Sequence, residues 1–156
     1  AAGVIAALRQ YWGDASPRPI IVEPELAACL FESAKTGKAT NVDIAEETLM
    51  AGLSCGEPSG LAWEILSEEA TDYLTIPEEL VAPTVRLLAK PLGNDAAVEA
   101  GESAIAGLAA LIAAMADPSL AEKLGLSSAS RVLLTGSEGV TDQAIFNMIM
   151  EGHEAA

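Results

Sequence analysis

Apolar residues recur at helical spacing from the second position of the chain, and the pattern predicts a helix over residues 2–12 that ends at Gly13. Residues 20–22 are apolar without alternation, which is typical of a buried strand in a parallel sheet covered by helices. Helical spacing returns over residues 26–34, with Pro24 expected in the first turn. This order of helix, strand and helix predicts one repeat of a wound α/β sheet.

The middle of the chain is mainly helical in pattern, with one ambiguous stretch. Residues 73–76, Tyr-Leu-Thr-Ile, suit either the end of a helix or a strand, and we favour a strand. Asp117 and Pro118 are suited to cap and begin a helix that ends at Gly125. The other helices are expected over residues 44–53, 63–74 and 77–89, and from after Asn94-Asp95 to Met115, where Gly101 is a candidate break.

Residues 131–134 are β-branched and apolar and predict a third buried strand. The strand would end in a small polar turn over residues 136–139, followed by a helix over residues 143–150 capped by Thr141 or Asp142. Open α/β sheets bind ligands where such strands end, although an ordinary β-to-α loop has the same pattern. Three strands are few for about seven helices, so we expect a helix-rich α/β fragment, with a small, mostly parallel sheet completed by a missing segment.

Composition restricts the partners of the chain. The 156 residues carry a formal net charge of -15, with a pI of about 4.2, which argues against a nucleic-acid surface and an anionic membrane surface. The longest apolar run, residues 104–116, is too short to cross a bilayer, and no segment resembles a signal peptide. A cytoplasmic protein is therefore expected. The chain begins without methionine, directly in a helical pattern, so we expect it to be cut just before that helix.

The residues needed for several common chemistries are missing. The single histidine, His153, lies in the tail, where a solvated side chain is expected, and neither cysteine lies in a Cys-x-x-Cys motif, so no metal site is predicted. There is no Gly-x-Ser-x-Gly nucleophile motif, no phosphate-binding Gly-Lys-Ser/Thr loop and no complete Gly-x-Gly-x-x-Gly. A single bridge between Cys29 and Cys55 is left open, because only coordinates test its geometry.

Three glycine-containing polar turns are the remaining candidates for a site. They cover residues 52–57, 100–104 and 136–139. A serine and a glutamate at a helix start also have a simple structural use, because serine caps the helix and glutamate favours the positive end of its dipole. The turns alone therefore do not distinguish a ligand site from helix capping.

Taken together, the turns and their neighbours resemble the fold-type-II pyridoxal-phosphate enzymes, and within them the diaminopropionate ammonia-lyases. The segments that carry the resemblance follow the family's order and cover nearly the whole chain: Ile-Val-Glu-Pro-Glu at 21–25, Ala-Cys at 28–29, Met-Ala-Gly-Leu-Ser-Cys-Gly-Glu-Pro at 50–58, Trp-Glu-Ile-Leu at 63–66, Gly-Asn-Asp at 93–95, Gly-Glu-Ser at 101–103 and Glu-Gly-Val-Thr-Asp at 138–142. The resemblance implies β-elimination of 2,3-diaminopropionate to pyruvate and ammonia, a step in amino-acid catabolism, with pyridoxal phosphate as electron sink.

The same resemblance implies site residues. Ser137 matches the position that hydrogen-bonds the pyridine nitrogen, and Glu102 and Ser103 match a turn that faces the cofactor. Gly52 matches the wall beside the ring, and Gly3 matches the tail of the glycine loop that holds the phosphate at a helix N-terminus. Most glycines of that loop are missing from this chain.

The resemblance also requires a lysine that forms the Schiff base, in a Ser-Phe-Lys-like setting. None of the four lysines has that setting, and all lie in polar or helix-end positions typical of the surface: Lys35, Lys38, Lys90 and Lys123. We therefore expect residues 1–156 to be the C-terminal portion of the enzyme. Alone it should have no catalytic residue, bind no cofactor and be inactive, with the N-terminal portion as its partner and a homodimer as its assembly. The alternatives are a serine or threonine dehydratase fragment and a non-catalytic α/β ligand-binding module.

Overall fold

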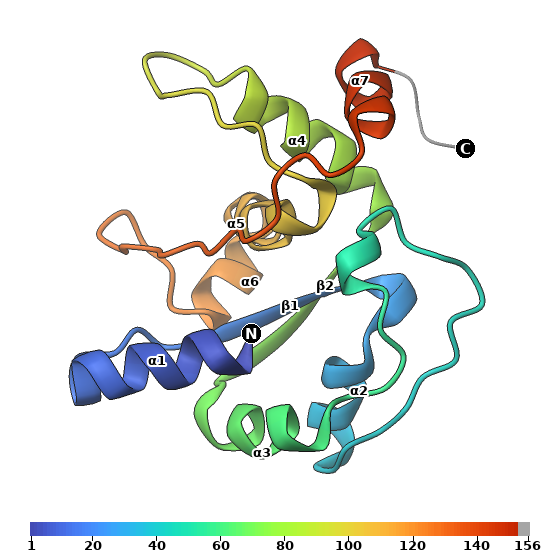
Figure 1. Cartoon of the computed structure of the whole chain (residues 1–156). Helices are drawn as coiled ribbons and strands as arrows, with labels where there is room; N and C mark the ends of the chain where they lie inside the picture. Colours follow the sequence, from blue (N-terminus) through green and yellow to red (C-terminus); the bar gives the residue numbers. More distant parts are fainter. Residues whose placement is uncertain (153–156) are drawn as a thin grey trace.

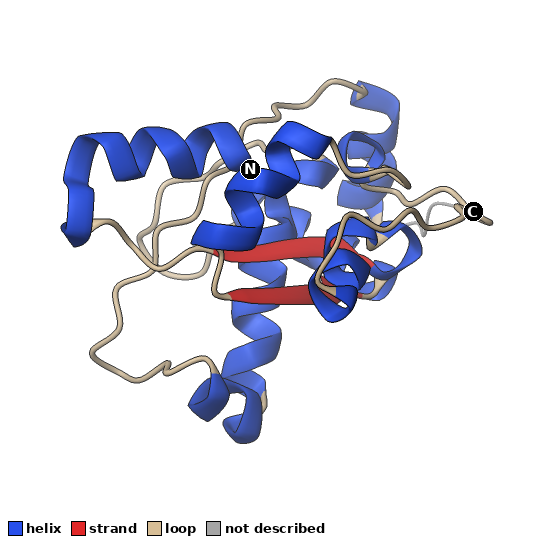
Figure 2. Ribbon diagram, turned by 90° about the horizontal axis from the view of Figure 1, so that it is seen from below, coloured by secondary structure: helices blue, strands red, loops and turns tan. Residues whose placement is uncertain are grey.

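Two parallel strands lie at the centre of the computed structural model, which describes residues 1–152 (Figures 1 and 2). Strand β1 (Ile20–Pro24) pairs with β2 (Asp72–Ile76), with Ile20 opposite Asp72 and Pro24 opposite Ile76. The strands predicted over residues 20–22 and 73–76 are therefore confirmed. The segment between them crosses one face of the sheet, as parallel strands require.

Helices cover both faces of this sheet, which confirms the predicted α/β class. Figure 1 shows α1, α2 and α3 on one side of the strands and α4, α5 and α7 on the other. The helices of the described residues are α1 (Ala2–Trp12), α2 (Cys29–Thr36), α3 (Gly60–Glu69), α4 (Val81–Ala89), α5 (Ala106–Ala116), α6 (Pro118–Lys123) and α7 (Gln143–Glu151).

The alternation of side chains along the strands creates two cores. Ile21 and Tyr73 face α1 and α3, where they pack with Ile5 and Leu66. The neighbouring strand residues face the other way, into a larger core with α4, α5 and α7 that contains Val22, Leu74, Ile76, Val81, Val85, Ile105, Phe146 and Ile149. Alanines on the inner side of α5 allow that helix to lie close to the strands.

Four predicted helices are confirmed, and so are the two N-caps predicted for them. The bounds of α1 agree with the pattern, and α4 occupies most of residues 77–89 after a short 3-10 turn. Asp117 caps α6 by accepting from the N–H groups of Ser119 and Leu120, and Gly125 follows that helix with a φ of 64°. Asp142 caps α7 in the same way, so the cap is Asp142 and not Thr141.

Two helix boundaries differ from the prediction. Pro24 ends β1 instead of beginning a helix, and a 3-10 turn (Glu25–Ala27) delays the start of α2 to Cys29. The helix expected over residues 63–74 begins earlier, at Gly60, because Ser59 supplies its N-cap. It ends at Glu69 because the chain then enters β2.

Two predicted helical stretches are wrong because tertiary contacts hold the backbone in other conformations. Residues 44–50 are irregular, and only a 3-10 turn (Ala51–Leu53) follows them. There the carboxylate of Glu78 accepts from the Thr48 hydroxyl at 2.6 Å and from the Leu49 N–H at 2.8 Å. Residues 95–101 are also irregular, and helical structure begins only after Gly101, with a 3-10 turn (Glu102–Ile105) that continues into α5.

The strand expected over residues 131–134 is also absent from the described structure. The segment has no strand partner, and the side chains of Val132, Leu133 and Leu134 are exposed. An extended segment becomes a strand only when its backbone groups find a ladder, and β1 and β2 pair only with each other. No helix within residues 1–152 is long and apolar enough to cross a membrane. His153 lies outside the described residues.

Candidate functional site

Three turns that are far apart in the sequence meet beside the start of α5. The N–H of Gly52 donates to the Ser103 hydroxyl oxygen at 2.9 Å, and the N–H of Ser103 donates to a carboxylate oxygen of Glu138 at 2.7 Å. The N–H of Gly101 donates to the backbone oxygen of Glu138 at 3.2 Å. The structure therefore brings Gly52 and Ser103 together with residues 136–139, which we call the Ser137 turn. We call Gly52, Gly101, Ser103 and the Ser137 turn the three-turn cluster.

Two glycines make this close approach possible. A Cβ atom on Gly101 would lie 2.5 Å from the backbone oxygen of Gly139 and 2.6 Å from the Glu138 carboxylate. A Cβ atom on Gly52 would lie 2.8 Å from the Ser103 hydroxyl oxygen. Neither position has room for a side chain, so the contacts between the turns depend on glycine at both places.

Ser137 lies at the edge of a hollow of about 420 Å³, which we call the Ser137 hollow. The turn over residues 136–139 forms one wall, and Leu88, Val98 and Leu108 form apolar parts of the others. The Ser137 side chain is exposed, and its hydroxyl has no hydrogen-bond partner among residues 1–152. The site thus offers a neutral donor and acceptor with its bonding capacity unused.

Of the other predicted site residues, one lies near the cluster and one lies elsewhere. Glu102 precedes Ser103 and is only 7% exposed, and its carboxylate oxygens still reach solvent, because no buried side-chain oxygen of the described residues lacks a hydrogen-bond partner. Gly3 lies in the first turn of α1, and a Cβ atom there would meet no atom within 4 Å. The structure therefore does not bring Gly3 to the three-turn cluster.

Glu138 is a residue of this site that the sequence did not predict. No local pattern links Glu138 to Ser103, because the two lie in different elements and their contact depends on the fold. The available signal was the pair of glycines that flank Ser137 and Glu138, since glycine often marks close backbone approach.

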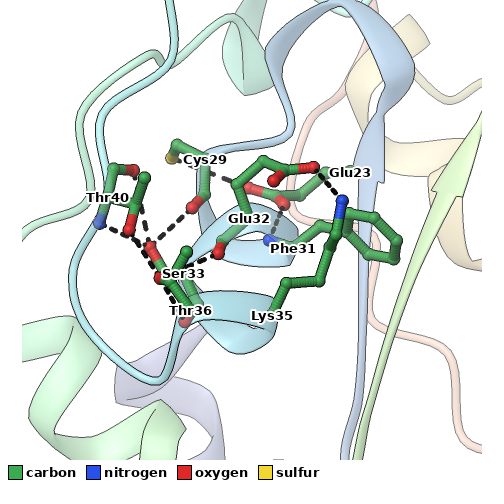
Figure 3. Close-up of polar contacts among 8 residues, drawn as sticks. All are labelled: Glu23, Cys29, Phe31, Glu32, Ser33, Lys35, Thr36 and Thr40. Atoms are coloured by element: carbon green, nitrogen blue, oxygen red, sulfur yellow. Dashed lines mark hydrogen bonds and ion pairs between the residues drawn. The ribbon is translucent and has the colours of Figure 1, made fainter.

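A second polar centre lies where β1 passes into α2 (Figure 3). Glu23 is buried, and its carboxylate accepts from the N–H groups of Leu30 at 3.0 Å and Phe31 at 2.7 Å, at the start of α2. The Cys29 thiol also donates to it, at 3.7 Å. Burial raises the pKa of the Glu23 carboxyl, although the three hydrogen bonds act in the opposite direction.

The two cysteines are free and differ in exposure. Cys29 is buried, and its burial, followed by the charge of Glu23, raises the pKa of its thiol to about 12. The Cys55 side chain is exposed and is also among the groups that raise the pKa of Cys29, so the two thiols are near enough to interact. The bridge that the sequence left open is not formed in this structure.

A second hollow lies along β1 and is mostly apolar. It has a volume of about 400 Å³ and is lined by Ile20–Val22 of β1, by Val4 and Leu8 of α1, by Ala110 and Ala114 of α5, and by residues 130–135. We call it the sheet-edge hollow. It separates β1 from the segment that has strand-like sequence but no strand partner.

Comparison with known proteins identifies the family. Residues 1–138 match the model of the family described as pyridoxal-phosphate-dependent enzymes. The chain belongs to this pyridoxal-phosphate-dependent family. It is 38% identical, over 99% of its length, to the diaminopropionate ammonia-lyase of Escherichia coli K12. The crystal structure of the holo diaminopropionate ammonia-lyase from Escherichia coli superposes on 97% of the chain with a TM-score of 0.86. An L-serine ammonia-lyase from the fungus Rhizomucor miehei shares the fold at 20% identity, with a TM-score of 0.71.

The chain spans only part of these relatives. It covers 40% of the length of the Escherichia coli ammonia-lyase sequence, 38% of the solved chain and 46% of the fungal chain. Its lysines are all exposed, as the sequence predicted, and Lys35 pairs with Glu32 at 2.8 Å on the surface. Among the described residues, no group of histidine, cysteine and carboxylate side chains could hold a metal ion.

Proposed function

We propose that this chain is the C-terminal portion of a pyridoxal-phosphate-dependent ammonia-lyase that converts 2,3-diaminopropionate to pyruvate and ammonia by β-elimination. The observation that carries the proposal is the meeting of Gly52, Ser103 and the Ser137 turn, in a chain 38% identical to a diaminopropionate ammonia-lyase. The same proposal implies a cytoplasmic enzyme of amino-acid catabolism.

The residues of the three-turn cluster fit the cofactor's ring. The Ser137 hydroxyl has no partner of its own, and it would hydrogen-bond the ring nitrogen without supplying a charge. Glu102, which precedes Ser103, and the turn at Gly52 would border the ring. When bound, pyridoxal phosphate supplies an electron sink for the electron pair released at the α-carbon of the substrate. This chain's own contribution is to orient the ring and to exclude water from one side of it.

The Schiff-base lysine must come from the rest of the enzyme. All four lysines of the chain are exposed, whereas the three-turn cluster holds none. We therefore propose that the chain alone is inactive and does not retain the cofactor, and that Gly3 contributes to phosphate binding only when the rest of the phosphate loop is present. Borohydride reduction that attached the cofactor to Lys35, Lys38, Lys90 or Lys123 would overturn this assignment.

The partner of the chain is the rest of the same enzyme, and we propose that it occupies the sheet-edge hollow. Both flanks of that hollow, β1 and residues 131–134, can accept a strand. Without that strand, the exposed apolar side chains of Val132, Leu133 and Leu134 should cause the chain to self-associate, most simply as a dimer. Light scattering tests this, and a monomer over a wide concentration range would contradict it. We propose that the complete enzyme is a homodimer.

The decisive experiment measures the products of the full-length enzyme. With 2,3-diaminopropionate, serine and threonine as separate substrates, we expect pyruvate and ammonia from 2,3-diaminopropionate at the highest kcat/KM. Preference for serine or for threonine, with 2-oxobutyrate as the product of the latter, would instead establish a dehydratase. Absence of a bound cofactor and of any product would favour a non-catalytic module. The lower identity to the serine ammonia-lyase, 20% against 38%, favours the first outcome.

A further inference from the structure

Glu138 is the residue that connects the Ser137 turn to the rest of the cluster. Its carboxylate accepts from the N–H of Ser103 at 2.7 Å, and its backbone oxygen accepts from the N–H of Gly101 at 3.2 Å. The side chain is partly buried, and no cation pairs with it within residues 1–152. Within residues 1–152, the hydrogen bonds that attach this turn to the start of α5 are therefore all made by Glu138, which uses both its side chain and its backbone.

The sequence of the helix start explains why a carboxylate is needed at this point. The 3-10 turn that leads into α5 has Gly101 as its N-cap, and glycine has no side chain to accept the free N–H groups of the first turn. Glu138 supplies that acceptor from another part of the chain. Its negative charge also suits the positive end of the helix dipole, and a hydrogen bond to a charged acceptor is stronger than one between neutral groups.

The contact extends beyond these two turns. The Ser103 hydroxyl oxygen accepts from the N–H of Gly52, so a shift of Ser103 would also move the 3-10 turn Ala51–Leu53. Ser137 directly precedes Glu138, while the Ser137 hydroxyl makes no hydrogen bond within residues 1–152. The nearest hydrogen bonds that tie the Ser137 turn to the start of α5 are therefore those of Glu138.

We propose that Glu138 is a positioning residue for the cofactor: its carboxylate holds the Ser137 turn against the start of α5 and so places the Ser137 hydroxyl for the ring nitrogen. The proposal rests on the proposed function insofar as Ser137 meets the ring, but it does not depend on which amino acid is the substrate. It assigns Glu138 no contact with substrate or cofactor.

The test compares variants of the full-length enzyme by the affinity for pyridoxal phosphate and by the visible absorbance of the bound cofactor. Loss of a hydrogen bond to a charged group corresponds to about a tenfold to a hundredfold change, so Glu138→Ala should weaken cofactor binding by that factor and shift the absorbance band. Glu138→Gln keeps one oxygen acceptor and should recover part of the loss. Glu122→Ala is the matched control, because Glu122 is an exposed carboxylate of α6 that lines neither hollow, and it should change neither property.

A double-mutant cycle separates positioning from general stabilisation. If Glu138 acts through Ser137, then Glu138→Ala should add little to the loss already caused by Ser137→Ala. Additive losses, or a Glu138→Ala enzyme with unchanged cofactor affinity and absorbance, would overturn the proposal. An enzyme that binds the cofactor but does not convert 2,3-diaminopropionate would contradict the proposed substrate, and the cycle on cofactor affinity would still decide the role of Glu138.

Discussion

Two segments of similar sequence have different structures in this molecule. Residues 20–24 and residues 131–134 are both rich in aliphatic and β-branched side chains, yet only the first forms a strand. Ile21 is 6% exposed, pairs with Tyr73 of β2 and is covered by α1 and α3, whereas Leu133 is 54% exposed and pairs with nothing described. The difference lies in the neighbours, because one segment has a partner strand and a covering helix and the other faces the sheet-edge hollow. A strand-forming sequence is therefore not sufficient by itself, because the segment also needs a partner strand to become a strand.

The largest contrast should come from truncating one aliphatic side chain of the paired sheet and one of residues 131–134. Ile76→Ala in β2 removes a side chain that is 2% exposed and should lower the free energy of unfolding by about 3 kcal/mol. Leu133→Ala should change it by less than about 0.5 kcal/mol in this chain. Urea denaturation of both variants measures the difference.

The same pair sharpens the comparison when the rest of the enzyme is present. In the full-length protein we expect Leu133→Ala to become as costly as Ile76→Ala, because the side chain would then be buried beneath the added strand. Equal costs already in this chain would mean that residues 131–134 belong to its own core, and the proposed docking of the missing portion would be wrong.

The sequence predicts those elements whose determinants are local. The caps of α6 and α7, the apolar run of β1 and the spacing in α1 and α4 need no information from distant residues. The failures lie where a distant group competes. Glu78 holds residues 48–49 away from a helix, and residues 131–134 lack the strand that they need. Propensity is a weak preference that such contacts override.

The site divides in the same way. Its glycines and hydroxyls could be selected from the sequence by their resemblance to a family, and the structure brings Gly52, Ser103 and the Ser137 turn together. The contact between Glu138 and Ser103 could not be predicted, because it depends on the path of the chain around α5. The phosphate-binding function expected of Gly3 depends on residues that this chain does not contain, and it stays a prediction.

The second-largest effect should come from a bridge between Cys29 and Cys55. If the bridge forms, it would tie the buried start of α2 to the exposed turn before α3 and raise the free energy of unfolding by about 3 kcal/mol. Cys55→Ser should abolish this gain under oxidising conditions and have little effect in reductant. Intact-mass measurement without reductant should then show the loss of two hydrogen atoms in the parent chain only. An unchanged mass after mild oxidation would rule the bridge out.

Helix caps provide a smaller and more local test of the two regions. Asp117 and Asp142 each accept from two N–H groups. Helix α6 follows the packed α5, whereas α7 follows the exposed residues 131–134 and the turn after them. Replacing either aspartate with alanine should cost about 1 kcal/mol if both helices are anchored. Urea denaturation of Asp117→Ala and Asp142→Ala makes the comparison. A negligible cost for Asp142→Ala alone would show that α7 is not anchored, like residues 131–134 before it.

The smallest expected effect is a change in the pH dependence of stability caused by Glu23 of β1. Burial raises the pKa of its carboxyl above the ordinary value of 4.5. As the pH rises through 4.5, the unfolded state therefore releases this proton while the folded state keeps it, and the free energy of unfolding falls until the pH passes the raised pKa. Glu23→Gln cannot titrate, so the parent chain should lose stability relative to this variant across that window. A constant offset is also expected, because the amide group can accept from only one of the N–H groups of Leu30 and Phe31.

The measurement that isolates this effect is the difference in unfolding free energy between the parent chain and Glu23→Gln, from about pH 4 to about pH 7. Glu122→Gln, at an exposed position, is the matched control for the other carboxylates and should show no such slope. A difference that does not change with pH would mean that Glu23 is ionised in the folded chain as readily as in the unfolded one. The hydrogen bonds from Leu30, Phe31 and Cys29 would then fully offset the effect of burial on the Glu23 carboxylate. Ionisation of Glu23 would in that case not lower the free energy of unfolding at neutral pH.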